Sequence, residues 1–145
     1  MDARSLSRRA RLGQTRGDLM AGFLNRRLPG LEQSSVLDVG SGKGGITTAF
    51  ADSVRSIVGI DIDSQNCIDS LAGRNSRIAS RQSLSIARAA AEALPFKDGT
   101  FDLVLLNGVL EWVGRYSNDP REIQQRAVSE AERVLRPRGH LYLAI

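Results

Sequence analysis

The sequence predicts an α/β protein, a Rossmann-like, doubly wound, mainly parallel sheet of about five strands with helices on both faces, preceded by an N-terminal helical arm. Two observations favour this class. From residue 36 to residue 145, short apolar runs alternate with helix-like segments, which is the pattern of parallel strands joined by crossover helices. In addition, a glycine cluster at residues 40–45 follows the first apolar run and opens the first helix-like segment. In such sheets this position binds ligands.

The first 35 residues differ from the remainder in charge. They carry seven arginines against three acidic residues, whereas residues 36–145 are balanced, so the net charge of +4 lies in this segment. Four apolar residues are spaced roughly as on one face of a helix, and Pro29-Gly30 then ends the pattern. These four are Leu12, Leu19, Phe23 and Leu24. We therefore expect a basic helical arm at residues 1–35 and a core domain at residues 36–145.

Within the core, each expected strand is a short apolar run. The runs fall at residues 36–39, 56–60, 84–88, 101–106 and 141–145. Helices are expected at residues 46–52 and 63–71, and a third begins at Asp119-Pro120-Arg121-Glu122. That start has a capping side chain, a proline in the first turn and a glutamate three residues after the cap. Pro137 and Gly139 are expected to end this helix before the last strand.

The composition excludes several classes of function. A single cysteine, Cys67, and a single histidine, His140, argue against a disulfide framework, a zinc site and a Ser-His-Asp triad. We expect no metal. Apolar runs are too short to span a membrane, and the first 30 residues lack the apolar core of a secretory signal. The sequence thus predicts a cytoplasmic protein with no membrane contact.

The glycine cluster points to a nucleotide-containing ligand. Gly40 and Gly42 allow a tight turn close to a ligand, and the helix that follows offers free amide donors. Asp61 ends the second strand 21 residues after Gly40, where a carboxylate can accept hydrogen bonds from a ribose diol. Gly40, Gly42 and Gly45 also fit the dinucleotide pattern G-x-G-x-x-G. These residues alone leave dinucleotide binding open.

Four segments, taken in order, resemble class I S-adenosylmethionine-dependent methyltransferases of the type 11-like group. They are residues 36–44 (VLDVGSGKG), 58–63 (VGIDID), 91–104 (AEALPFKDGTFDLV) and 133–141 (RVLRPRGHL). The resemblance implies that S-adenosylmethionine is the cofactor and that the chain transfers its methyl group to an acceptor. It does not identify the acceptor, for which a small molecule or glycan is slightly favoured. A degenerate methyltransferase-like scaffold or a dinucleotide-binding module, in either case without turnover, is the alternative.

The resemblance also implies roles for single residues in cofactor binding. The methionine part would lie against the loop after the first strand, the ribose and adenine against the ends of the second and third, and the sulfonium near the end of the fourth. The residues implied are Asp38, Gly40, Ser41, Gly42, Gly44, Asp61, Ile62, Ala91, Glu92, Ala93 and Asn107. Ala90 departs from the pattern, because the family often has an aspartate there that binds the adenine amino group.

Acceptor binding is expected in the loop after the fourth strand. Glu111 is the candidate for a catalytic base or a ligand for a cationic substrate, and it is equally compatible with a solvated position. Trp112 is a candidate aromatic wall and Tyr116 a further candidate, although packing explains Trp112 at least as well. By resemblance, the arm is expected to close over the cofactor as a lid. Its arginines, Arg8, Arg9 and Arg11 among them, also permit a nucleic-acid partner.

The end of the sequence gives a last expectation. The family's sheet normally continues with two further strands as an antiparallel hairpin, whereas this chain ends at Ile145, within or just after its fifth strand. The outer edge of that strand would then be unpaired, which favours pairing with another chain. A homodimer through this edge is therefore predicted.

Overall fold

The computed structural model describes residues 3–74 and 83–145, with side chains from 15 to 73 and from 83 to 145. Five strands form one parallel sheet in the order β3-β2-β1-β4-β5. The strands are β1 (Ser35–Val39), β2 (Ser56–Asp61), β3 (Leu84–Arg88), β4 (Phe101–Asn107) and β5 (Leu135–Ala144). The helices are α1 (Ala3–Arg27), α2 (Gly45–Phe50), α3 (Ser64–Arg74) and α4 (Pro120–Val134), and a short 3-10 turn spans Leu31–Gln33. This confirms the predicted α/β class.

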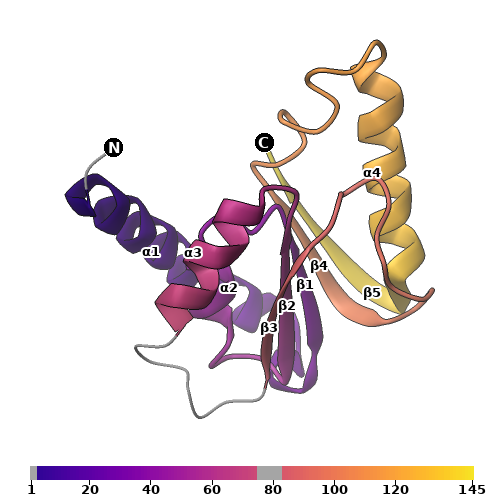
Figure 1. Ribbon diagram of the computed structural model, residues 1–145. Helices are drawn as coiled ribbons and strands as arrows, with labels where there is room; N and C mark the ends of the chain where they lie inside the picture. The colour runs from indigo at the N-terminus through magenta and orange to yellow at the C-terminus, as the bar shows by residue number, and fades with distance from the viewer. Residues whose placement is uncertain (1–2, 75–82) are drawn as a thin grey trace.

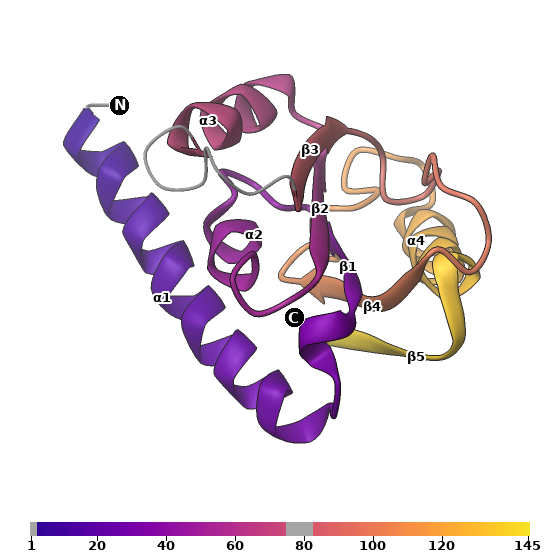
Figure 2. The same cartoon turned by 90° about the horizontal axis from the view of Figure 1, so that it is seen from below.

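Helices cover both faces of the sheet. α1, α2 and α3 lie on one face and α4 on the other (Figures 1 and 2). Successive residues of a strand point to opposite faces, so Val36 packs with Phe50 on the α1 and α2 side, whereas Leu37 packs with Ala131 on the α4 side. With both faces covered, the central strands are apolar along almost their whole length, as parallel sheets require.

The strand order reverses beside β1. The chain passes from β1 outward to β2 and β3, then returns to place β4 on the other side of β1. At this reversal the connections leave the carboxyl ends of β1 and β4 in opposite directions, which opens a crevice between them. A ligand site is therefore expected among the segments that follow β1, β2, β3 and β4.

The predicted apolar stripe of α1 was wrong in part. The face that packs on α2 and the sheet consists of Gly17, Met20, Ala21 and Leu24, whereas Leu19 is 71% exposed and Phe23 43% exposed. A Cβ at Gly17 would lie 2.5 Å from the Cβ of Ala49, so glycine is what allows α1 and α2 to approach. The predicted stripe failed because it counted only large apolar side chains, whereas small residues such as Gly17 and Ala21 form part of the packed face. The Leu12 side chain lies outside those described.

The last strand begins earlier than predicted. α4 ends at Val134, and β5 starts at Leu135, which pairs with Phe101. An irregularity then separates this pair from the regular pairing that resumes at His140 with Leu103. Arg138 has a φ of 67° in this stretch, so Pro137 and Gly139 shape a bulge within the strand instead of ending the helix.

β5 lies at one edge of the sheet. Its outer side pairs with no strand among residues 3–74 and 83–145. Self-association through this edge stays a prediction. Within the described part of the chain, no helix is long and apolar enough to cross a membrane.

Candidate functional site

A cavity of about 630 Å³ lies at the carboxyl ends of the strands. Its lining comes from four segments, each of which follows one of the strands β1 to β4. These residues are Val39, Gly40, Gly42, Asp61, Ile62, Asp63, Asn66, Ala89, Ala90, Ala91, Glu92, Gly108, Val109, Trp112, Val113, Gly114, Arg115 and Tyr116. The cavity occupies the position expected for a ligand of a doubly wound sheet.

The loop after β1 presents its backbone to this cavity. Gly40 and Gly42 have φ angles of 71° and 54°, in the left-handed region that favours glycine. A Cβ at Gly40 would collide with the side chain of Val109, whereas a Cβ at Gly42 would meet nothing within 4 Å. The peptide of Gly42 therefore faces open space in the cavity, where a ligand can lie directly against the backbone.

Asp61 fixes this loop to the end of β2. Its Oδ2 accepts a hydrogen bond from the Gly42 amide at 2.9 Å, and its Oδ1 accepts one from the Asp63 amide at 2.9 Å. Asn66 Nδ2 donates to the same Oδ1 at 3.3 Å. A carboxylate offers about four acceptor positions, so these three bonds leave one free, and the longer Asn66 contact is the easiest to exchange for a ligand hydroxyl.

A second aspartate lies beneath the loop. Asp38, 2% exposed, accepts a hydrogen bond from Thr47 Oγ1 at 2.6 Å. Burial, together with the nearby charge of Asp61, raises the pKa of Asp38 to about 7 against the opposing effect of the hydrogen bonds from Thr47. The Ser41 hydroxyl is also buried and has no hydrogen-bond partner among the described residues. The cavity wall under the glycine loop therefore holds polar groups that are only partly satisfied.

The segments after β2 and β3 form the adjoining wall. Ile62 lines the cavity yet remains 61% exposed, which leaves a large apolar side chain available to a flat ligand. Glu92 and the small residues 89–91 line the same side. Arg88 Nε donates to the Ile62 carbonyl at 2.9 Å and so ties the end of β2 to β3.

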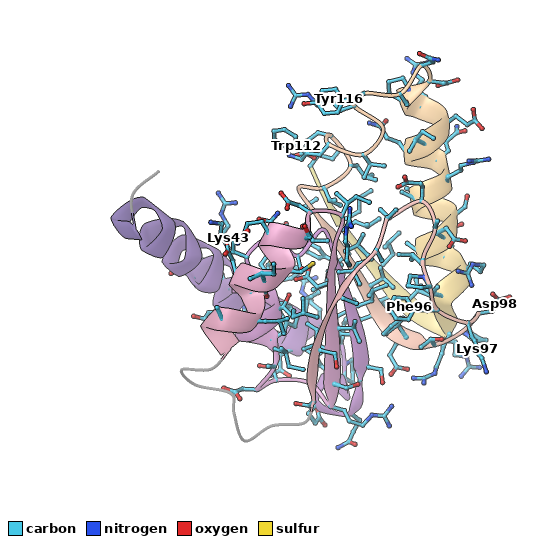
Figure 3. The ribbon with its side chains drawn as sticks, viewed as in Figure 1. Lys43, Phe96, Lys97, Asp98, Trp112 and Tyr116 are labelled. Atoms are coloured by element: carbon cyan, nitrogen blue, oxygen red, sulfur yellow. The ribbon has the colours of Figure 1, made fainter. Side chains whose placement is uncertain are left out.

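The opposite wall is the loop between β4 and α4, residues 108–119. Trp112 is 61% exposed and Tyr116 is 94% exposed. Figure 3 shows the Trp112 and Tyr116 side chains projecting from this loop beyond the strand ends. The Arg115 guanidinium lies 4.8 Å from the centre of the Trp112 ring and 5.9 Å from that of Tyr116. This wall thus carries a cation flanked by two aromatic rings.

The structure brings together part of the predicted cofactor set. Of the eleven residues, six line the cavity: Gly40, Gly42, Asp61, Ile62, Ala91 and Glu92. Asp38 and Ser41 lie beneath the loop, and Gly44 packs against Ser70 of α3. Ala93 and Asn107 adjoin lining residues in sequence but are not among the lining residues described.

Of the three residues predicted for the acceptor wall, two line the cavity and one does not. Trp112 and Tyr116 line the cavity, whereas Glu111 is exposed and is not among the described lining residues, so its catalytic role stays a prediction. Sequence reasoning missed Arg115 and Asn66 altogether. The signal for Arg115 was its position between two aromatic residues of the same loop.

The arm does not cover this cavity with any described side chain. Residues 17–24 pack on α2 and the sheet, and no described lining residue comes from α1. The lid expectation was therefore wrong for residues 15–27. Arg8, Arg9 and Arg11 lie outside the described side chains.

Comparisons with known proteins identify the family. A family model described as "Methyltransferase domain" matches residues 37–143, so the chain belongs to this family and has its Rossmann-like fold. A malonyl-[acyl-carrier protein] O-methyltransferase of Enterobacter lignolyticus is 31% identical over 121 residues, covering 83% of this chain and 42% of the relative. The chain spans less than half the length of the curated relatives that it matches.

Solved structures agree on the fold. A putative S-adenosyl-L-methionine-dependent methyltransferase of Methanococcus maripaludis superposes with a TM-score of 0.74 at 19% identity, covering 94% of this chain and 57% of that one. The [4+2]-cyclase SpnF superposes with a TM-score of 0.69 at 26% identity, covering 86% and 43%. The fold is thus shared by proteins that are named for different reactions.

Proposed function

We propose that the chain binds S-adenosylmethionine in the cavity at the strand ends and transfers its methyl group to a small-molecule acceptor. The observation that carries this proposal is the pairing of Gly42 with Asp61. The Gly42 backbone is open to the cavity, and its amide is bonded to the carboxylate that ends β2. Backbone contact and a sugar-binding carboxylate are therefore held in one rigid unit.

The residues present fit this cofactor. The ribose hydroxyls of this cofactor are hydrogen-bond donors that suit the carboxylate of Asp61, on the wall that also carries Asp63 and Glu92. The exposed side chain of Ile62 offers an apolar surface to an adenine ring. Ala90, where the family often has an aspartate, lines the cavity, so it falls to Glu92 or a backbone carbonyl to meet the adenine amino group.

When bound, S-adenosylmethionine supplies a methyl group that is already activated for transfer to a nucleophile. The chain's own contribution is positioning, because displacement requires nucleophile, methyl carbon and leaving sulfur in line. The loop at Gly40 and Gly42 holds one end of that line, and the wall at Trp112 and Val113 bounds the space in which the acceptor must lie.

Calorimetric titration tests the cofactor part of this proposal. We expect S-adenosylmethionine and S-adenosylhomocysteine to bind, and NADH not to bind. NADH binding without S-adenosylhomocysteine binding would instead assign the chain to the dinucleotide-binding class that the glycine pattern leaves open.

A second function is favoured by one comparison. The similarity to a protein named a [4+2]-cyclase is compatible with cofactor binding without methyl transfer. Incubation with methyl-labelled S-adenosylmethionine and a small-molecule extract separates the two, because only a methyltransferase moves the label into other small molecules.

The relative named a malonyl-[acyl-carrier protein] O-methyltransferase supports an acyl acceptor over a glycan.

A further inference from the structure

The cavity has walls of opposite charge. Asp61, Asp63 and Glu92 lie on the side formed by the segments after β2 and β3, whereas Arg115 is the only cation among the described lining residues. Arg115 comes from the loop after β4, on the wall that carries Trp112 and Tyr116. A ligand that spans the cavity therefore meets carboxylates at one end and a guanidinium at the other.

Arg115 is held in place yet leaves its hydrogen bonds unused. Its guanidinium carbon lies 4.8 Å from the centre of the Trp112 ring, within the range of a cation–π contact. The five N–H donors lie at the edge of the guanidinium plane and stay free to bind a carboxylate in a bidentate way. None of the ion pairs or side-chain hydrogen bonds between described residues involves this guanidinium. Such a group is prepared for an external anion.

Arg115 is exposed, and the loop that carries it also presents apolar side chains to the cavity. Val109, Trp112 and Val113 line the cavity beside it, and the 61% exposure of Trp112 leaves a large apolar surface uncovered. An inorganic anion would leave this surface in water. An organic acid with an apolar body would cover it and also pair with the guanidinium.

We propose that the acceptor is an organic carboxylate, bound through its carboxylate group by Arg115 with its apolar part against Trp112 and Val113. This inference rests on the proposed function, because it assigns the acceptor half of the same cavity. The charge separation supports it. The carboxylates of the other wall are proposed to accept hydrogen bonds from the ribose and adenine, which leaves the Arg115 guanidinium available to a second ligand of negative charge.

Trp112 supplies a direct probe, because it is the only tryptophan of the 145-residue chain. The protein is first saturated with S-adenosylhomocysteine, and hexanoate is then titrated while tryptophan emission is recorded at constant ionic strength. Hexanamide, a neutral molecule of the same shape, is the ligand control. We expect a saturable change in tryptophan emission with hexanoate. Hexanamide should bind at least about tenfold more weakly, because the charge-assisted pair with Arg115 is lost.

Two variants complete the test. Arg115→Gln should weaken hexanoate binding about tenfold, while Arg121→Gln, at an exposed arginine near the start of α4, should leave it unchanged. Far-UV circular dichroism verifies that both variants fold. Equal binding of hexanoate and hexanamide, equal binding by Arg115→Gln and the parent, or no saturable response to hexanoate would each overturn the proposal.

S-adenosylhomocysteine titrations separate this proposal from the function on which it rests. If the parent protein does not bind S-adenosylhomocysteine, the proposed function fails first. If Arg115→Gln loses S-adenosylhomocysteine affinity but keeps affinity for 5'-methylthioadenosine, which lacks the amino-acid part, then Arg115 binds the cofactor's own carboxylate. That result would overturn the acceptor assignment and leave the proposed function standing. We expect both affinities to stay within about twofold of the parent, because the proposal places no cofactor contact on Arg115.

Discussion

The two walls of the cavity are held in different ways. On the cofactor side, bonds cross between elements: the Gly42 amide to Asp61, Thr47 to the buried Asp38, and the Ser41 amide to the Ile60 carbonyl at 2.8 Å. On the acceptor side, most bonds are local turns, such as the Ser117 amide to the Gly114 carbonyl at 2.8 Å. The first wall is bonded to the strands of the sheet, whereas the second is the loop that follows the carboxyl end of β4.

This difference separates two requirements of the site. A wall fixed by buried cross-strand bonds can bind one constant ligand, and a change there disturbs the fold as well as binding. A wall of exposed side chains on local turns can change without unfolding the domain. We infer that the wall formed by the loop after β1 and the end of β2 binds the ligand that members of the family share. The loop at residues 108–119 then determines which acceptor is used.

The largest effect is expected at Asp38. Because burial raises its pKa from 3.8 to about 7, the folded protein holds this proton to a higher pH than the unfolded chain does. The contribution of Asp38 to stability is therefore full below about pH 4 and is lost as the pH rises through about 7, a change of roughly 4 kcal/mol in the free energy of unfolding. Asp38→Asn cannot titrate and should lack this fall.

Urea unfolding of the parent and of Asp38→Asn across this pH range measures the difference directly. Asp18→Asn, at an exposed position of α1, is the control and should keep the parent's pH profile. Parallel profiles for the parent and Asp38→Asn would show that Asp38 ionises normally, against its burial.

The next largest effect is expected where the two walls touch. Gly40→Ala places a Cβ against Val109 at a left-handed backbone position, which should cost about 2–4 kcal/mol in the free energy of unfolding. Gly42→Ala has the same backbone cost but no collision, so it should cost about 1–2 kcal/mol.

A double-mutant cycle sharpens this comparison. Val109→Ala removes the Val109 methyl groups but keeps its Cβ, which a Cβ at Gly40 would approach to 2.9 Å. Adding it to Gly40→Ala should therefore recover part of the cost of the collision, and it should recover nothing when added to Gly42→Ala. Urea unfolding of six proteins supplies the values: the parent, the three single variants and the two double variants. Equal losses for the two glycine variants would show that a Cβ at position 40 does not collide with Val109 and that the two walls are not in tight contact there.

A smaller effect is expected at Asp61. Asp61→Asn keeps the shape of the side chain but loses the charge that accepts from Gly42 and, by our proposal, from a ribose hydroxyl. S-adenosylhomocysteine affinity should fall by about 1.5–3 kcal/mol, measured by calorimetry. Since Asp61 is 9% exposed and bonded to three groups, a loss of unfolding free energy should accompany the loss of affinity. Unchanged affinity would remove Asp61 from the site.

The smallest effect is expected at Trp112. Because its ring is 61% exposed, Trp112→Ala should change the free energy of unfolding by no more than about 0.5 kcal/mol. S-adenosylhomocysteine affinity should also stay close to the parent value. A large loss of stability in chemical unfolding would show that this loop is part of the core and that the two walls are not held differently.

The same contrast explains what the sequence predicted. Glycines at residues 40–45, Asp61 and the apolar strands follow rules of local chain geometry. The sheet and the position of Gly40, Gly42 and Asp61 at the strand ends could therefore be predicted, whereas their binding of a cofactor stays a prediction. Packing depends on partners that a sequence pattern does not name, which is why the pattern did not predict that Gly17 forms the contact between α1 and α2. Arg115 was missed for a related reason: its role depends on the cavity and the Trp112 ring beside it, neither of which follows from spacing.

Hydrogen exchange with and without saturating S-adenosylhomocysteine tests whether the cofactor binds to the wall formed by the loop after β1 and the segment after β2. We predict slower exchange for the amides of residues 40–44 and 61–66, with a much smaller change at residues 109–116. Slower exchange confined to residues 109–116, or no change anywhere at saturation, would contradict it.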